Sequence, residues 1–174
     1  MNIFFLHMIP RICAMMHCDK HVVKMILETA QMLCAVWHIV DPDHEFHDPP
    51  YKLAHKNHPC TIWARESLAN YNWLCQLGLE LSKEYTYRYG KRHASESYIK
   101  DMSEMIPPIP DDVFTTPAQA MPDMYKDDDS VVAYRTYYFF DKHRMHSWKG
   151  KIAGRDPPGW IQEMYSMFND TATN

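Results

Sequence analysis

The chain has 174 residues, of which 46% are hydrophobic and only five are glycine. This length is sufficient for one domain with a buried core, and the composition excludes both a disordered chain and a many-turned β-sandwich. The net charge of −4 argues against a general nucleic-acid coat protein. No uninterrupted apolar run reaches the length of about 18 residues that a membrane span needs, so we expect no membrane association.

The chain start and the cysteines indicate a cytoplasmic protein. The segment from Met1 to Leu6 is apolar but lacks the basic region and the cleavage site of a signal peptide. The five cysteines are odd in number and show no disulfide-type spacing. We therefore expect reduced thiols.

The first predicted helix runs from Asp19, its expected N-cap, to Val40, and Asp41-Pro42 supplies the stop. Its apolar residues recur at helical spacing over one broad face. The opposite stripe, here called the polar seam, is narrow and consists of Lys20, His21, Lys24, Glu28, Gln31 and His38. The pattern therefore predicts a mostly buried helix with one polar side.

Further helices follow a loop over residues 41–58. Pro59 and Thr61 open the longest predicted helix, which ends at Tyr89 with Gly90 as its C-cap. Shorter helices are expected from Ser95 to Met105, from Asp129-Ser130 to Lys142, and from Trp160 to Phe168. These elements predict an all-α fold, a compact bundle of three main helices with long loops and extra short C-terminal helices, as a single domain over residues 1–174.

Two polar seam residues, Lys24 and Glu28, lie one helical turn apart, with Gln31 beside them. They can form a simple surface ion pair, although Lys before Glu is the less favourable order for helix stability. A carboxylate between apolar walls and near an amine can instead act as a general acid or base. The residues alone favour the structural interpretation and leave the catalytic one open.

Histidine pairs raise the question of a metal. His17 and His21, His55 and His58, and His143 and His146 are close in sequence. None has the ligand spacing of a zinc finger, a zincin or a deaminase, and eleven histidines produce close pairs by chance. The chain also lacks a dinucleotide-binding or P-loop motif. We expect no metal and no cofactor.

Cations alternate with aromatic residues in two segments, 87–93 and 131–155. The second holds six Lys or Arg residues and one acid. Such segments can be core helix followed by a solvated tail, or a surface that stacks bases and binds phosphates. The candidate DNA-binding residues are Lys20, His21, His58, Arg88, Lys91, Arg92, Arg135, Lys142, Arg144, Trp148 and Lys149.

The run from Cys18 to Gln31, followed by Lys56-Asn57-His58-Pro59 at the start of a long helix, resembles the pyrimidine-dimer DNA glycosylase family of the phage endonuclease V type. The resemblance covers residues 1–92 and, more loosely, 131–155. It implies a helical DNA-binding fold without a metal. It also implies double-stranded DNA with damaged or modified pyrimidines as the partner, and the cytoplasm of a bacterium or a phage-infected host as the location.

The resemblance also implies a mechanism. An N-terminal α-amine attacks the anomeric carbon of the damaged nucleotide, a glutamate assists, and the resulting imine permits β-elimination of the backbone phosphate. Glu28 matches that glutamate, and Gln31 falls where the prototype has an arginine. Because Asn2 is too bulky for ready removal of the initiator methionine, the expected nucleophile is the Met1 amine. Lys24 is the other candidate, although an adjacent carboxylate favours the charged form of an amine.

Three functions compete. The leading hypothesis is a DNA glycosylase and abasic-site lyase in which Glu28 is the acid–base group, supported by Lys24 and Gln31. The second is a nucleic-acid base-modifying transferase on the same scaffold. The third is a non-enzymatic helical module that binds nucleic acid or protein. We expect Lys24, Glu28 and Gln31 to line one cleft.

Overall fold

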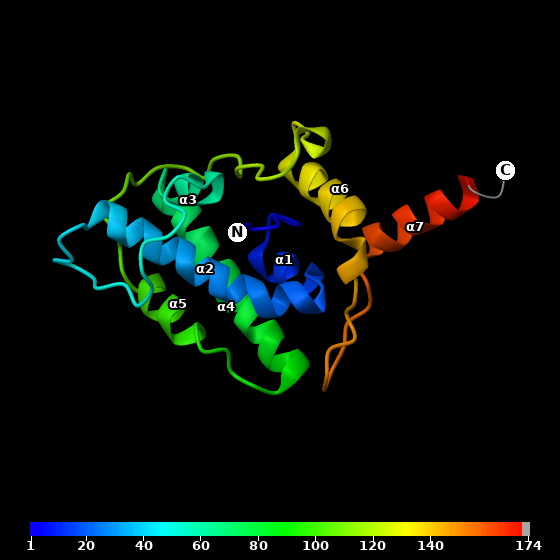
Figure 1. Ribbon diagram of the computed structural model, residues 1–174, viewed down its shortest axis with the longest axis horizontal. Helices are drawn as coiled ribbons and strands as arrows, with labels where there is room; N and C mark the ends of the chain where they lie inside the picture. The colour runs from blue at the N-terminus through cyan, green and yellow to red at the C-terminus, as the bar shows by residue number, and fades with distance from the viewer. Residues whose placement is uncertain (172–174) are drawn as a thin grey trace.

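The computed structural model describes the backbone of residues 1–171 and the side chains up to residue 168. Over this range the fold consists of helices and loops without strands, which confirms the predicted all-α class. The elements are α1 (Pro10–Met16), α2 (Asp19–Val40), α3 (Pro59–Ala64), α4 (Leu68–Tyr89), α5 (Glu96–Ser103), α6 (Ser130–Lys142) and α7 (Gly159–Thr171), with short 3-10 helices η1 (Asp123–Tyr125) and η2 (His143–Met145) (Figure 1).

Helices α2 and α4 form the centre of the bundle, and α1, α3 and α5 pack around them (Figure 1). Their close approach depends on Gly78 of α4, because a Cβ atom there would lie 2.8 Å from the Thr29 Cγ2 atom and 2.9 Å from the Ile99 Cδ1 atom. The five cysteines are free and buried. The core therefore needs no disulfide.

Helix α2 is long and apolar enough, by length and composition alone, to cross a membrane. However, 67% of its most apolar 18-residue window is buried inside the protein. Burial of this kind is what the central helix of a globular core requires. The predicted polar seam is correct only in part: Lys20 and Lys24 are exposed, whereas His21 and Glu28 are buried. The exposed side of the helix also includes the apolar residues Val23 and Leu27.

Helix boundaries agree with the predictions in part. Gly90 ends α4 in the left-handed conformation, with a φ of 64°, and Asp129 caps α6 through the amides of Val131 and Val132. The predicted helix from Pro59 to Tyr89 is in fact two helices, because Ser67 accepts a hydrogen bond from the Asn70 amide and starts α4 anew. Helix α2 is capped by Cys18, so Asp19 is its first residue and not its N-cap. Helix α1 was not predicted.

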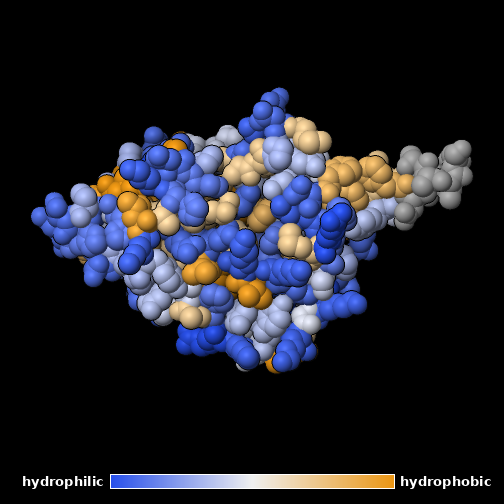
Figure 2. All heavy atoms as spheres, viewed as in Figure 1, coloured by the Kyte–Doolittle hydropathy of each residue, from blue (hydrophilic) through white to orange (hydrophobic). Residues whose placement is uncertain are grey.

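Helix α7 extends away from the bundle (Figure 1). It carries apolar side chains, among them Tyr165, and it is the apolar projection in a view whose surface is otherwise largely hydrophilic (Figure 2). It is anchored at its base by Ile161, which belongs to the buried core.

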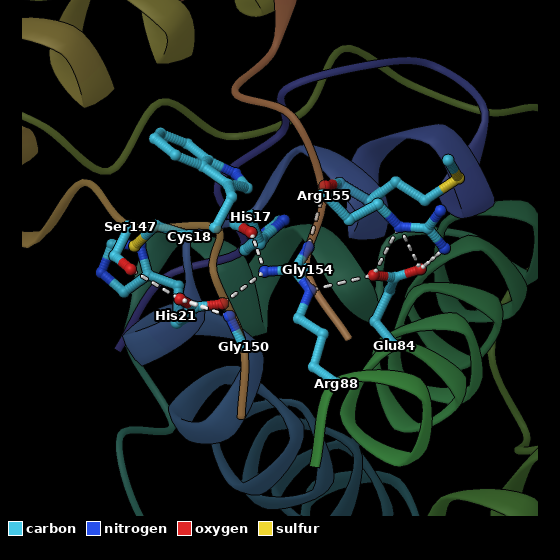
Figure 3. Close-up of polar contacts among 12 residues, drawn as sticks. His17, Cys18, His21, Glu84, Arg88, Ser147, Gly150, Gly154 and Arg155 are labelled. Atoms are coloured by element: carbon cyan, nitrogen blue, oxygen red, sulfur yellow. Dashed lines mark hydrogen bonds and ion pairs between the residues drawn. The ribbon is translucent and has the colours of Figure 1, made fainter. Parts of the chain in front are cut away.

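Four charged residues, here called the Arg88 cluster, join the start of α2, the last turns of α4 and the segment before α7. They are Asp19, Glu84, Arg88 and Arg155. The Arg88 guanidinium is inaccessible to solvent and donates to the carboxylates of Glu84 and Asp19, each at 3.1 Å. Arg155 also donates to Glu84, so two cations face two carboxylates (Figure 3). A buried charge is tolerated only when it is paired in this way.

Two predicted DNA contacts, Arg88 and Trp148, are wrong because both side chains are buried. Arg88 donates its remaining hydrogen bonds to the carbonyls of Met15 and His17, which leaves no donor facing solvent. Trp148 is also buried, and its indole nitrogen donates to the Met16 carbonyl at 3.0 Å. Both side chains hold the fold together and are unavailable for DNA.

Replacing Arg88 should therefore be costly. We expect Arg88→Met to lower the free energy of unfolding by about 3–5 kcal/mol, because Glu84 and Asp19 lose a buried counter-ion. The matched control is Arg92→Met, which breaks the exposed i,i+4 pair with Glu96 and should cost about 1 kcal/mol or less. Urea unfolding followed by circular dichroism measures both values, and equal effects would contradict this role for Arg88.

Candidate active site

The N-terminal segment, residues 1–6, enters the core because Ile3, Phe5 and Leu6 are fully buried. Phe4 has a φ of 43°, a left-handed conformation that is unfavourable for a bulky residue and that bends the segment. The Phe4 carbonyl accepts from the Leu6 amide at 2.8 Å, inside this bend. The first two residues are thereby turned toward α2.

Asn2 anchors this bend. Its side-chain oxygen accepts from the amides of Ile3 and Phe4, at 2.7 and 3.1 Å. Its side-chain nitrogen donates to the Ala120 carbonyl at 2.8 Å, which ties the segment to the loop before η1. Because Asn2 is buried with all of these contacts, the start of the chain has a defined position.

The carboxylate of Glu28 receives the start of the chain. Its Oε2 atom lies 3.7 Å from the Met1 amine and accepts a hydrogen bond from the Asn2 amide at 2.9 Å. Its Oε1 atom lies 3.1 Å from the Lys24 ammonium. Glu28 itself is buried, whereas the Lys24 side chain is 67% exposed. One carboxylate thus contacts two amines at the edge of the core.

These groups line a pocket of about 290 Å³, here called the Glu28 pocket. Met1, Asn2 and Phe4 of the N-terminal segment form one side. Helix α2 contributes Lys20, His21, Lys24, Met25 and Glu28. The third side consists of Tyr137 and Lys142 of α6 and Met145 of η2. Three lysines and one carboxylate therefore surround a partly apolar cavity.

A larger pocket of about 430 Å³ lies elsewhere, near Phe5, Phe114 and Val131. Its charged side chains are the carboxylates of Asp128 and Asp129, which would repel phosphate. It has no amine beside a proton-transfer group, so the Glu28 pocket is the better candidate for chemistry.

The structure brings together most of the catalytic candidates. Met1, Lys24 and Glu28 meet in the Glu28 pocket, but Gln31 lies outside its lining. The prediction that Lys24, Glu28 and Gln31 line one cleft is therefore wrong for Gln31. The sequence did not lead us to assign five of the lining residues to the site: Asn2, Phe4, Met25, Tyr137 and Met145. For Asn2 and Phe4, the apolar start of the chain already indicated that this segment would be buried.

His21 was a predicted DNA contact, but it is a buried part of the pocket wall. Its ring stacks on Phe4 at a centroid distance of 4.3 Å, and its Nδ1 atom lies 2.8 Å from the Tyr138 hydroxyl. That hydroxyl also accepts a hydrogen bond from the Cys18 amide at 2.8 Å. Burial, with repulsion from His17 and nearby lysines, lowers the His21 pKa to about 3. The ring is therefore neutral at physiological pH and supplies no charge for phosphate.

The remaining DNA-binding candidates differ in exposure. Lys20, Lys91, Arg92, Arg144 and Lys149 are exposed, whereas His58, Arg135 and Lys142 are half-buried. Arg135 donates to the Leu6 carbonyl at 3.0 Å, and His58 accepts from the Cys60 amide as the N-cap of α3. Lys20 and Lys142 lie at the pocket itself, which makes them the cations best placed for a substrate there.

Among the described residues, no group of three or more His, Cys, Asp or Glu side chains is placed to hold a metal ion. Of the histidine pairs in the sequence, His17 and His21 pack in the core. His58 caps α3, and the His146 Nε2 atom lies 3.1 Å from the Tyr138 carbonyl.

The two core histidines predict a pH dependence of stability. Burial lowers the pKa of His17 to about 4 and that of His21 to about 3, below the value of about 6.5 expected in the unfolded chain. The unfolded state binds more protons between these values, so stability should fall as the pH drops from 6.5 to 4. In urea titrations, His17→Gln should flatten this dependence by up to about 1.4 kcal/mol per pH unit. A His17→Gln profile parallel to wild type would contradict the assignment.

Comparison with known proteins identifies the family. The family model described as pyrimidine dimer DNA glycosylase matches residues 1–97, which is more than half of the 174 residues. No curated protein and no solved structure matches the chain. The matched region contains Met1, Lys24 and Glu28. The chain therefore belongs to the pyrimidine dimer DNA glycosylase family, and a DNA-repair glycosylase function acting on DNA follows from that membership.

Proposed function

We propose that this protein excises damaged pyrimidines from DNA and cleaves the strand at the resulting site, with the Met1 amine as nucleophile and Glu28 as the acid–base group. The observation that carries the proposal is the 3.7 Å separation between the Met1 amine and the Glu28 carboxylate at the wall of a pocket. An amine beside a proton-transfer group is the arrangement that covalent catalysis on a sugar carbon needs.

The proposed reaction begins with transfer of a proton from the Met1 ammonium to Glu28. The neutral amine then attacks the anomeric carbon, and a new carbon–nitrogen bond forms as the glycosidic bond breaks. The pyrimidine leaves with the electron pair of that bond and takes up the proton that the attacking nitrogen loses. Protonated Glu28 gives its proton to the ring oxygen as the sugar opens to a protonated imine. The Glu28 carboxylate then takes the C2′ proton as the 3′ phosphate leaves. Water hydrolyses the imine and restores the amine.

Lys24 is less suited to be the nucleophile. Lysine side chains have pKa values of about 10.4 in peptides, whereas α-amines have values of about 8, so an α-amine is neutral more often near pH 7. The Lys24 ammonium binds the other oxygen of Glu28, and its side chain is largely exposed. In the proposed mechanism Lys24 holds the carboxylate in position, together with the Asn2 amide.

Phosphate binding is assigned to the lysines around the pocket. Lys20, Lys24 and Lys142 lie on its walls, and Arg144 is exposed in the adjoining η2. A local group of cations explains how a chain with a net charge of −4 can bind DNA.

Borohydride reduction tests the mechanism, because it converts the imine into a stable amine. With duplex DNA containing an abasic site, we expect a covalent protein–DNA complex whose mass shift maps to the N-terminal peptide. Selective acetylation of the α-amine should abolish the complex. Glu28→Gln keeps the shape of the side chain and should slow trapping by about 10²–10⁴-fold.

The control is Glu80→Gln, which alters a carboxylate paired with Lys83 outside the Glu28 pocket and should trap at the wild-type rate. An adduct on the peptide that carries Lys24 would overturn the choice of nucleophile. Absence of any adduct would remove the imine mechanism and favour a base-modifying transferase.

A further inference from the structure

The third side of the Glu28 pocket comes from α6 and η2, which lie beyond residue 97, where the family match ends. Tyr137 of α6 is half-buried there. Its ring is nearly parallel to that of Phe4, at 19° and a centroid distance of 6.1 Å. The Lys142 ammonium lies 4.7 Å from the centre of the Tyr137 ring, and Tyr125 packs against it at 5.4 Å. The Tyr137 ring is thus held in place on several sides.

The small size of the pocket limits where the base of a bound nucleotide can lie, and Tyr137 lines that space. A sugar carbon that reacts with the Met1 amine must come within about 3–3.5 Å of it. The base attached to that carbon then occupies the remainder of a cavity of about 290 Å³. The apolar side chains of the pocket wall are Met1, Phe4, Met25, Tyr137 and Met145. Two of them are aromatic. Phe4 is only 5% exposed and its ring stacks on His21, whereas Tyr137 is half-buried and is the aromatic ring with more accessible surface.

We infer that Tyr137 is a specificity residue, which packs against the pyrimidine and favours nucleotides that still carry a base over abasic sites. The inference rests on the proposed function, since it takes the Met1 amine as the reacting group. Contacts of this kind between an aromatic side chain and a base are worth about 1–3 kcal/mol. A residue that only supported the fold would not distinguish the two kinds of DNA.

The test compares the affinities for two duplexes of the same sequence. One contains a single thymine dimer, and the other has a tetrahydrofuran residue, which lacks a base, at the same position. Fluorescence anisotropy gives both dissociation constants without requiring catalysis. Tyr137→Leu should lower the preference for the dimer duplex by about tenfold. Tyr137→Phe keeps the ring and should stay within about twofold of wild type.

Phe140→Leu is the matched control, because Phe140 is an aromatic residue of the same helix that lies outside the pocket lining. It should keep the wild-type preference. An unchanged preference in Tyr137→Leu, or equal losses of affinity for both duplexes, would overturn the inference. So would a wild-type protein without any preference for the dimer.

Borohydride trapping separates this result from the proposed function. Wild-type protein that forms the covalent complex on abasic DNA, but whose preference is insensitive to Tyr137→Leu, would contradict the role of Tyr137 and leave the amine mechanism standing. Wild-type protein that neither traps nor binds either duplex would contradict both.

Discussion

The ion pair between the Met1 amine and Glu28 depends on burial of the N-terminal segment. Ile3, Phe5 and Leu6 are inaccessible to solvent, and removing such side chains from water supplies the free energy that draws the segment into the core. The amine and the carboxylate then meet at 3.7 Å, at a place where an unpaired charge would be unfavourable. The hydrophobic core thus determines where the Met1 amine lies.

Helix α2 connects this site to the rest of the protein. Its first residue, Asp19, accepts from the Ser147 hydroxyl at 2.7 Å and from the Gly150 amide at 3.1 Å. The same carboxylate belongs to the Arg88 cluster, which links α2 to α4 and to Arg155. Two turns further along, α2 presents Lys24 and Glu28 to the pocket. Contacts that hold the C-terminal part of the chain therefore also hold the third side of the pocket.

The residues that line the Glu28 pocket come from two parts of the chain, one inside and one outside the region that matches the family. Residues 1–97 contain the amine, Glu28 and Lys24, which are the groups assigned to bond making and proton transfer. Tyr137, Lys142 and Met145 follow later in the chain and shape the space beside them. In our proposals, the reacting groups therefore lie within the matched region, and the residue that sets substrate preference lies outside it.

Much of the fold could be predicted from local patterns. The cap at Asp129 and the stop at Gly90 are signals within a few residues of sequence, and the structure shows both in place. The break between α3 and α4 was missed because apolar spacing continues across it, although Ser67 is a common N-cap residue. Helix α1 was missed because seven residues are too few for a clear period.

The site was harder to predict, because it joins residues that are distant in sequence. The contact between Met1 and Glu28 joins the start of the chain to the middle of α2, and only the family resemblance indicated it. Arg88 and Trp148 were assigned to DNA because composition cannot tell a buried cation or indole from an exposed one. Their partners, Glu84, Asp19 and the Met16 carbonyl, become neighbours only after folding.

The most direct measurement of the central claim is a crystal structure of the protein reduced by borohydride on DNA with an abasic site. The account predicts continuous density between the Met1 nitrogen and C1′ of the opened sugar, with the Glu28 carboxylate in contact with that nitrogen. Density that instead joins the sugar to the Lys24 Nζ atom, or to a residue outside the Glu28 pocket, would contradict it.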